Sequence, residues 1–137
     1  MSRTQKTWVR VRPKPTRPKV PDRIKGEVSQ AAEELLTEDL RPTYVKEPPI
    51  DPQFNYIVDL FSKWYGSYFY LCAKYACPGP YAISPFFETK FARMEYAGEN
   101  RFHLSYMRHT GKWFEVNQNL SSEECLEHIR AEPSFQP

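Results

Sequence analysis

The sequence predicts an α+β fold with an N-terminal amphipathic helix, an antiparallel β-meander and a short C-terminal helix. Three observations support this fold class: an apolar stripe at helical spacing after residue 22, a series of aromatic and β-branched segments separated by turn residues, and a capping box near the C-terminus. The chain has 137 residues, which is enough for one modest core and too few for two domains. We therefore expect one folded domain over residues 22–137.

Residues 1–21 are expected to form an extended basic arm. This segment contains four prolines, Pro13, Pro15, Pro18 and Pro21. Because proline fixes φ and lacks a backbone donor, they favour a polyproline-like conformation. Residues 1–25 carry nine basic side chains and one acidic side chain, a net charge of +8, whereas residues 26–137 carry ten basic and sixteen acidic side chains, a net charge of −6. A positive arm on an acidic body suggests a polyanionic partner for the arm.

A helix is expected to follow Asp22, whose side chain can cap a helix N-terminus. Its apolar residues recur at helical spacing and mark one face, and they are Ile24, Val28, Ala31, Leu35 and Leu36. We expect this helix to end before Pro42. The proline-rich residues 41–53 should then form a stiff linker rather than a regular element.

The segment from Tyr56 to Tyr65 fits either a helix or a strand, and we favour a helix-like start followed by a strand from Tyr68 to Tyr75. The sequence Cys-Pro-Gly-Pro at residues 77–80 then breaks the chain. Turn residues at 97–100 and 109–111 separate the segments that follow. We expect three strands there, from Phe86 to Tyr96, from Arg101 to Arg108 and from Lys112 to Val116.

The middle strand of this meander alternates apolar and polar residues. Phe102, Leu104 and Tyr106 should share one buried face, while the residues between them face water or cover something polar. Trp113 is expected to pack beside Phe102 or Leu104 across the second turn, because aromatic rings dominate small cores. On the polar face, His103 and Arg93 of the neighbouring strand could meet.

A short closing helix is predicted near the C-terminus. Ser121 and Glu124 have the spacing of a capping box, and Pro133 should end the helix. The apolar stripe of this helix is made of Cys125, Leu126 and Ile129.

The second half of the chain resembles a family of small bacterial proteins known as domain of unknown function 3024. The resemblance depends on the residues 90–93, 102–108 and 111–113 and on a helix that ends in Glu132 and Pro133, and it covers about a third of the chain. It supports the predicted strand order. Because the family has no assigned activity, it implies no chemistry.

Nucleic acid is the first candidate partner. Cations that neutralise phosphates and a tryptophan that stacks on bases suit RNA or another single strand. The candidate nucleic-acid-binding residues lie in the arm and around the meander, and they are Trp8, Arg10, Arg12, Lys14, Arg17, Lys19, Arg93, Arg108 and Lys112. This pattern predicts a non-catalytic accessory protein that its arm anchors to RNA or to a ribonucleoprotein assembly.

Two other readings of the arm remain open. The arm contains the spacing of a polyproline ligand, Arg12, Pro15 and Pro18, which docks in an aromatic groove of another protein. In that case the protein would be an adaptor between proteins that uses its proline-rich arm. The arm could also be a solubilising tail without a ligand. The sequence leaves the oligomeric state open.

An enzyme is the competing class. Glu88 and Lys90 lie on the same side of a predicted strand, as in metal-dependent nucleases where a carboxylate holds the ion, and Asp59 could be a second ligand. Glutamate and lysine are also common on any solvated strand, so we favour a protein that is not an enzyme. No catalytic triad pattern, phosphate-binding glycine loop or dinucleotide fingerprint is found, and we expect no cofactor.

The three cysteines fit a reducing compartment. An odd number of cysteines without an apolar export signal favours free thiols and a cytoplasmic protein, and no apolar run is long enough to span a membrane. Cys72, Cys77, Cys125 and His128 have the ligand types of a zinc site, but no tight Cys-x2-Cys knuckle is present. We expect these cysteines to act as small hydrophobic residues, with no metal bound.

Overall fold

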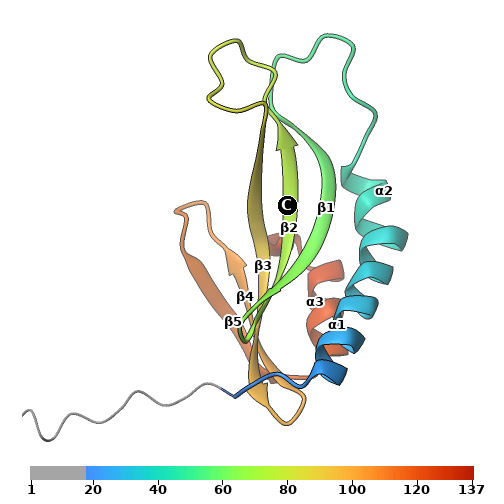
Figure 1. Ribbon diagram of the computed structural model, residues 1–137, viewed down its shortest axis with the longest axis vertical. Helices are drawn as coiled ribbons and strands as arrows, with labels where there is room; N and C mark the ends of the chain where they lie inside the picture. Colours follow the sequence, from blue (N-terminus) through green and yellow to red (C-terminus); the bar gives the residue numbers. More distant parts are fainter. Residues whose placement is uncertain (1–17) are drawn as a thin grey trace, which may run out of the picture.

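The computed structural model describes residues 18–137 and consists of one long N-terminal helical segment, a five-stranded sheet and a C-terminal helix (Figure 1). The helical segment comprises α1 (Asp22–Leu35), the π-helical turn η3 (Leu36–Leu40) and α2 (Arg41–Tyr44). The strands are β1 (Tyr56–Tyr65), β2 (Tyr68–Ala76), β3 (Phe86–Gly98), β4 (Arg101–Met107) and β5 (Trp113–Leu120). The chain ends with α3 (Ser122–Ala131) and the 3-10 turn η4 (Pro133–Phe135). The predicted α+β class and order of elements are confirmed.

The sheet is an antiparallel meander in the order β1-β2-β3-β4-β5. Both α1 and α3 lie on the same side of it (Figure 1), and the core fills the space between helices and sheet. The largest side chains of this core that are fully buried come from both layers, and they are Leu36, Leu60, Phe69, Leu71, Met94, Phe102, Leu104 and Phe135. Within residues 18–137, no helix packs on the opposite face of the sheet, which we call the helix-free face.

The N-terminal helix continues past Pro42, so the prediction that it ends before this residue is wrong. The π turn allows this, because the Arg41 amide donates to the carbonyl of Leu36, five residues earlier, and the wider turn precedes the ring of Pro42. The Thr43 hydroxyl donates to the Asp39 carbonyl at 2.8 Å. The connection to the sheet therefore begins at residue 45 rather than at residue 41.

The prediction of a helix-like start in the segment from Tyr56 to Tyr65 is also wrong, because this whole segment forms strand β1. It pairs with β2 from Tyr56 opposite Ala76 to Tyr65 opposite Tyr68, with one irregularity near Asp59. The hairpin turn places Gly66 at φ +59°, a conformation that favours glycine. The other predicted strands are confirmed within a few residues of their expected bounds, as is the capping box at Ser121.

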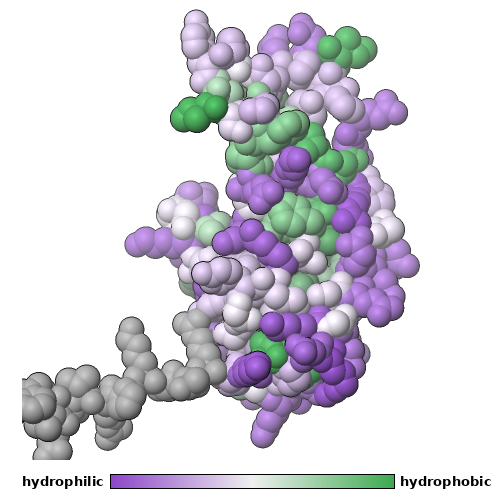
Figure 2. All heavy atoms as spheres, in the orientation of Figure 1, coloured by the Kyte–Doolittle hydropathy of each residue, from purple (hydrophilic) through white to green (hydrophobic). Residues whose placement is uncertain are grey.

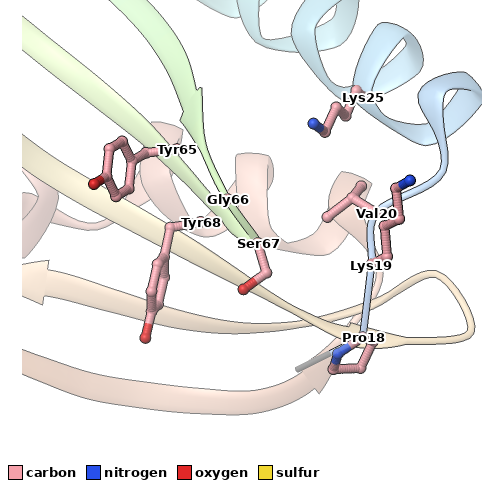
Figure 3. A pocket seen from close by; sticks show the side chains of 8 residues that line it. All are labelled: Pro18, Lys19, Val20, Lys25, Tyr65, Gly66, Ser67 and Tyr68. Carbon is pink, nitrogen blue, oxygen red and sulfur yellow. The ribbon is translucent and has the colours of Figure 1, made fainter. Parts of the chain in front are cut away.

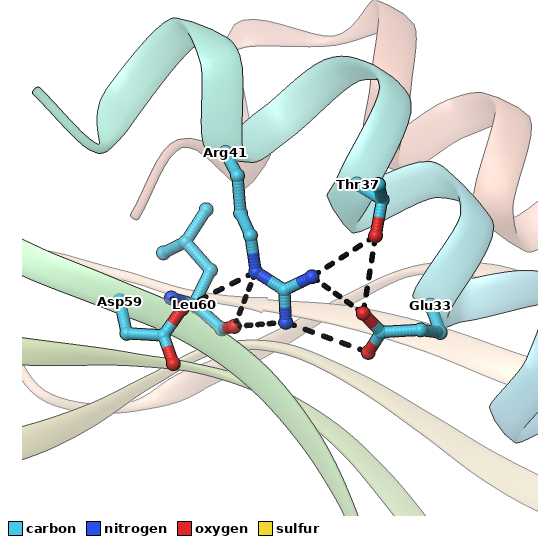
Figure 4. Close-up of polar contacts among 5 residues, drawn as sticks. All are labelled: Glu33, Thr37, Arg41, Asp59 and Leu60. Atoms are coloured by element: carbon cyan, nitrogen blue, oxygen red, sulfur yellow. Dashed lines mark hydrogen bonds and ion pairs between the residues drawn. The ribbon is translucent and has the colours of Figure 1, made fainter.

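Arg41 attaches the helical segment to β1 (Figure 4). Its guanidinium donates to the backbone carbonyl of Leu60 through Nη2 at 2.8 Å and through Nε at 3.1 Å. It also contacts the carboxylates of Glu33 and Asp59 and the hydroxyl of Thr37. Because β1 is an edge strand, Arg41 supplies donors to a carbonyl that no neighbouring strand can reach.

The folded domain begins before Pro21. Val20 is buried in the core beside α1, and Pro18 lies against Gly98 in the β3-β4 turn. Val20 therefore belongs to the core, although it lies within residues 1–21, which were expected to form an extended arm. No helix in residues 18–137 has the length and apolar character needed to cross a membrane.

Candidate functional site

The helix-free face carries a group of aromatic and basic side chains that meet near its centre. Successive residues of a strand point to opposite faces, and residues that pair across strands share a face. Tyr70 pairs with Arg93, Arg93 pairs with Ser105, and Cys72 pairs with Lys90, which places all of them on the face opposite the core. We call the group Tyr68, Tyr70, Lys90, Arg93 and Trp113 the aromatic-basic cluster.

Arg93 occupies the middle of this cluster. Its guanidinium carbon lies 4.9 Å from the ring centre of Tyr68 and 4.9 Å from that of Trp113, so one cation contacts two rings on different strands. Nη2 donates to the hydroxyl of Ser105 at 3.4 Å, a long hydrogen bond. Nε is buried and has no hydrogen-bond partner among the described residues. Arg93 therefore keeps donor capacity in a place where the surrounding rings reduce its hydration.

Lys90 and two further ring contacts extend the cluster. The Lys90 ammonium lies 4.5 Å from the ring centre of Tyr70. The Tyr70 ring lies 5.8 Å from Trp113 and 6.0 Å from Tyr68. Tyr70 is on β2 and Trp113 on β5, so these side chains lean toward one another over the two strands between them. Rings and cations thus form one connected surface across four strands.

Trp113 does not lie where the sequence predicted. It was expected beside Phe102 or Leu104 in the core, but it contacts Tyr70 and Arg93 on the helix-free face and is only half-buried. The next ring along this strand, Phe114, faces the other side of the sheet and contacts Tyr106, but it is 43% exposed. Trp113 pairs with Met107, which is three residues from Leu104 in β4, so Trp113 faces away from Phe102 and Leu104.

The predicted site residues separate into three groups. Arg93 is in the aromatic-basic cluster. Arg108 and Lys112 lie in the exposed β4-β5 turn. The guanidinium carbon of Arg108 lies 5.0 Å from the ring centre of Phe114, and the backbone amide of Arg108 donates to the Lys112 carbonyl. The remaining residues belong to the arm, and of these Lys19 is exposed at the start of the described chain, whereas Trp8, Arg10, Arg12, Lys14 and Arg17 lie outside the described residues.

A cavity of about 550 Å³ lies next to the cluster, at the β1-β2 hairpin (Figure 3). Tyr65 and Tyr68 line it from the hairpin, Lys25 lines it from α1, and Pro18 and Lys19 form its wall on the N-terminal side. Tyr68 is shared between this cavity and the aromatic-basic cluster. The arm therefore joins the domain beside the cluster rather than at a distant point.

The residues proposed for a metal-dependent nuclease do not assemble into a site. Glu88 and Lys90 lie on the helix-free face, paired with Lys74 and Cys72 of β2. Asp59 forms an ion pair with Arg41 on the helical side, at 3.2 Å. Within residues 18–137, no three side chains of His, Cys, Asp or Glu are grouped closely enough to hold a metal ion.

The possible zinc ligands are likewise distributed over both layers. Cys72 lies on the helix-free side of β2, whereas Cys125 is in the core on α3 and His128 contacts Glu132 on the same helix. Burial raises the pKa of the Cys72 thiol to about 11 and that of the Cys125 thiol to about 12. Both thiols therefore stay protonated at neutral pH, and all three cysteines are free.

Sequence reasoning identified Arg93 but missed the three aromatic residues around it. Tyr68 and Tyr70 were recognised as strand residues, and Lys90 was considered only as part of a nuclease pair. Pairing the strand from Tyr68 with the strand from Phe86 could have placed Arg93 beside Tyr70, but alternation alone would have put Lys90, three residues away, on the other face. The irregularity between the pairs Leu71–Ala92 and Cys72–Lys90 brings Lys90 to the same face, and a simple alternating pattern does not reveal it.

The fold and the cluster together define a small α+β protein whose sheet is covered by helices on one face and bears rings and cations on the other. The chain belongs to the family described as domain of unknown function (DUF3024), whose model matches residues 18–137. No curated protein and no solved structure matches the chain. The family match begins at Pro18, two residues before Val20, which is in the core.

Proposed function

We propose that this protein is a non-catalytic accessory protein of the cytoplasm that binds single-stranded RNA, free or within a ribonucleoprotein, through its basic arm and its aromatic-basic cluster. The observation that carries this proposal is the position of Arg93 between Tyr68 and Trp113 with Lys90 over Tyr70. Proteins that bind single strands combine aromatic rings on which bases stack with cations that follow the phosphates.

The arm and the cluster would contribute different interactions. The cluster includes only two cations, and the same face bears Glu88 and Glu95, so its net charge is small. The arm supplies the greater share of positive charge, since residues 1–25 carry +8. We therefore assign attraction of the phosphates mainly to the arm and stacking of bases to Tyr68 and Trp113, with Trp8 adding a ring from the arm.

The proximity of arm and cluster supports binding of one strand by both. Lys19 and Tyr68 line the same cavity, and Tyr68 contacts Arg93. An RNA strand that leaves the arm at Lys19 meets Tyr68 and then Arg93, with Glu95, the β3 partner of Tyr68, as the acidic neighbour on this route. Joining two weak sites in this way raises the effective concentration of the second contact.

The test measures binding of a labelled single-stranded RNA by fluorescence anisotropy over a range of salt concentrations. Replacing Arg10, Arg12, Lys14, Arg17 and Lys19 with glutamine removes five charges, so the slope of log K against log salt should fall by up to about 3 to 4. Trp113→Ala should weaken binding by about 5- to 100-fold without changing the slope, because a stacked base contributes about 1–3 kcal/mol. Trp8→Ala should behave like Trp113→Ala.

The matched control is Phe114→Ala, which removes the neighbouring ring on the opposite face of β5. It should leave affinity nearly unchanged, and an equal loss in both variants would remove the cluster from the proposal. Absence of binding to RNA or DNA at low salt would overturn the function itself and leave a protein partner as the leading candidate. Binding that responds little to salt and is lost when Pro15 and Pro18 become alanine would indicate a polyproline receptor.

A further inference from the structure

We propose that two copies of this chain associate through the end of the molecule formed by the α2-β1 loop and the β2-β3 loop. These loops comprise residues 45–55 and 77–85. Their sheet ends are adjacent, because Tyr56 pairs with Ala76 and Ala76 pairs with Phe86. Both loops extend beyond the helices at the same end of the sheet (Figure 1). This inference does not depend on the proposed RNA binding.

Large apolar side chains are exposed at this end to a degree that a monomer rarely shows. They are Ile50 (105% exposed), Phe54 (81%), Tyr81 (96%), Ile83 (106%), Phe86 (46%) and Phe87 (38%). Figure 2 shows separate strongly hydrophobic spots on the two loops at this end, with paler surface between them, whereas the helical side is mainly hydrophilic. We refer to these six residues as the apolar end.

The area of the apolar end fits the requirement of a dimer. A large exposed side chain presents about 150–250 Å², so the four loop residues Ile50, Phe54, Tyr81 and Ile83 together expose roughly 700 Å². Phe86 and Phe87 are consecutive in β3 and face opposite sides of the sheet, so only one of them can extend this surface. A single exposed patch on a monomer is typically about 300–600 Å². Each partner in a stable protein complex buries about 800 Å². The exposed side chains of the apolar end therefore supply most of the area that one side of a specific interface buries.

Prolines stiffen both loops, and backbone hydrogen bonds also close the β2-β3 loop. In the β2-β3 loop the Cys77 amide donates to the Pro85 carbonyl at 2.8 Å, and the Ala82 amide donates to the Gly79 carbonyl at 3.2 Å. The α2-β1 loop contains Pro48, Pro49 and Pro52, which fix φ at three positions. Such preorganisation lowers the entropy lost on association, so the exposed rings and isoleucines can be used for binding.

The charges at the apolar end favour a second copy over a polyanion or an anionic membrane. Residues 77–85 contain no charged side chain, and residues 45–55 contain one cation, Lys46, and two anions, Glu47 and Asp51. This end therefore does not attract phosphates. In a two-fold arrangement the same surface meets itself, and Lys46 of one copy can approach Asp51 of the other.

The test is sedimentation velocity of the full-length protein, free of nucleic acid, over about a hundred-fold range of concentrations. The wild-type chain should reach twice its monomer mass of 16.2 kDa as concentration rises. The double variant Ile50→Asp with Ile83→Asp should remain monomeric, with its dissociation constant raised at least about ten-fold. Both side chains are fully exposed, so neither substitution removes a core contact.

Two further variants make the result specific. Tyr65→Ser removes an exposed ring at the other end of β1 and should leave the dimer intact. Lys46→Asp should weaken the dimer, and the exchange Lys46→Asp with Asp51→Lys should restore it. A wild-type chain that stays monomeric at every concentration overturns the proposal. So does a dimer that survives the double isoleucine variant, because another surface would then hold it.

Discussion

The guanidinium of Arg93 shows how one side chain can link three strands on a face that has no helical cover. It contacts Tyr68 on β2 and Trp113 on β5, and it donates to Ser105 on β4. A lysine at this position could not contact two rings and donate in a plane at the same time. The sequence identified Arg93 as a basic residue on a polar face, but the rings around it come from β2 and β5, and only the pairing of the strands brings them to that face.

At the scale of single residues we predict that the three cysteines differ in reactivity. Iodoacetamide at pH 8 should alkylate Cys77 of the native, dilute protein, since this residue is half-buried in a loop. Cys72 and Cys125 should resist, because burial raises their pKa values to about 11 and about 12 and leaves little thiolate. Intact mass should show one added group, and peptide mapping should place it on Cys77.

The same reaction in strong denaturant is the control, and it should label all three thiols. Rapid labelling of Cys72 in the native protein would mean that β2 opens or that the helix-free face is less well packed than its side-chain contacts indicate.

At the scale of elements, the sequence predicted the meander and the capped C-terminal helix because their signals are local. Turn residues bound each strand, and Ser121 and Glu124 form both hydrogen bonds of the capping box.

The two errors at this scale, the start of β1 and the end of the N-terminal helix, arose where tertiary contacts decide the structure. Tyr56–Tyr65 carries aromatic and aliphatic residues that suit a helix or a strand, and its pairing with β2 selects the strand. Pro42 is a helix terminator in most settings, but the π turn before it and the attachment of Arg41 to β1 keep the chain helical.

The contact between Arg41 and β1 should contribute measurably to stability. Arg41→Met should lower the free energy of unfolding by about 1–3 kcal/mol, because the Leu60 carbonyl loses its charged donor. Glu33→Gln should cost less than about 1 kcal/mol, since the Glu33 carboxylate is largely exposed. Chemical denaturation at pH 7 measures both effects.

The pH dependence distinguishes the carboxylate from the backbone contact. The hydrogen bond from Arg41 lowers the pKa of Glu33, so the pair contributes its full stability above the unfolded-state pKa of about 4.3 and loses it as pH falls through the lower folded-state value. The difference in free energy of unfolding between wild type and Glu33→Gln should therefore disappear in acid. The effect of Arg41→Met should persist in part there, because the Leu60 carbonyl does not titrate. If both differences disappeared together, the bond to Leu60 would have no separate role.

At the scale of the whole molecule, the chain divides into a basic segment and an acidic folded body, and two findings locate the boundary. Among residues 18–137, Val20 is the first whose side chain lies in the core, and the family match starts at Pro18. The charge asymmetry was visible in the sequence, but the exact boundary was not, because a lone valine among lysines and prolines gives no periodic signal. Its burial depends on α1 and the sheet lying close by, which is a tertiary property.

This boundary leads to a prediction about two truncations that differ by three residues. Deletion of residues 1–17 should leave the melting temperature nearly unchanged, whereas deletion of residues 1–20 should lower it by about 5–15 °C. The difference arises because burial of a valine contributes about 1.5–3 kcal/mol and each kcal/mol corresponds to several degrees in a domain of this size. Differential scanning calorimetry of both truncations and of full-length Val20→Ala compares them directly. The melting temperature of Val20→Ala should lie between those of the two truncations, since this variant keeps the backbone and the contact of Pro18 with Gly98.

Equal melting temperatures for the two truncations would show that Val20 contributes nothing to the core. A marked decrease on removal of residues 1–17 alone would show that the arm itself stabilises the domain, and the basic segment would then be part of the fold rather than an appendage available to a polyanion.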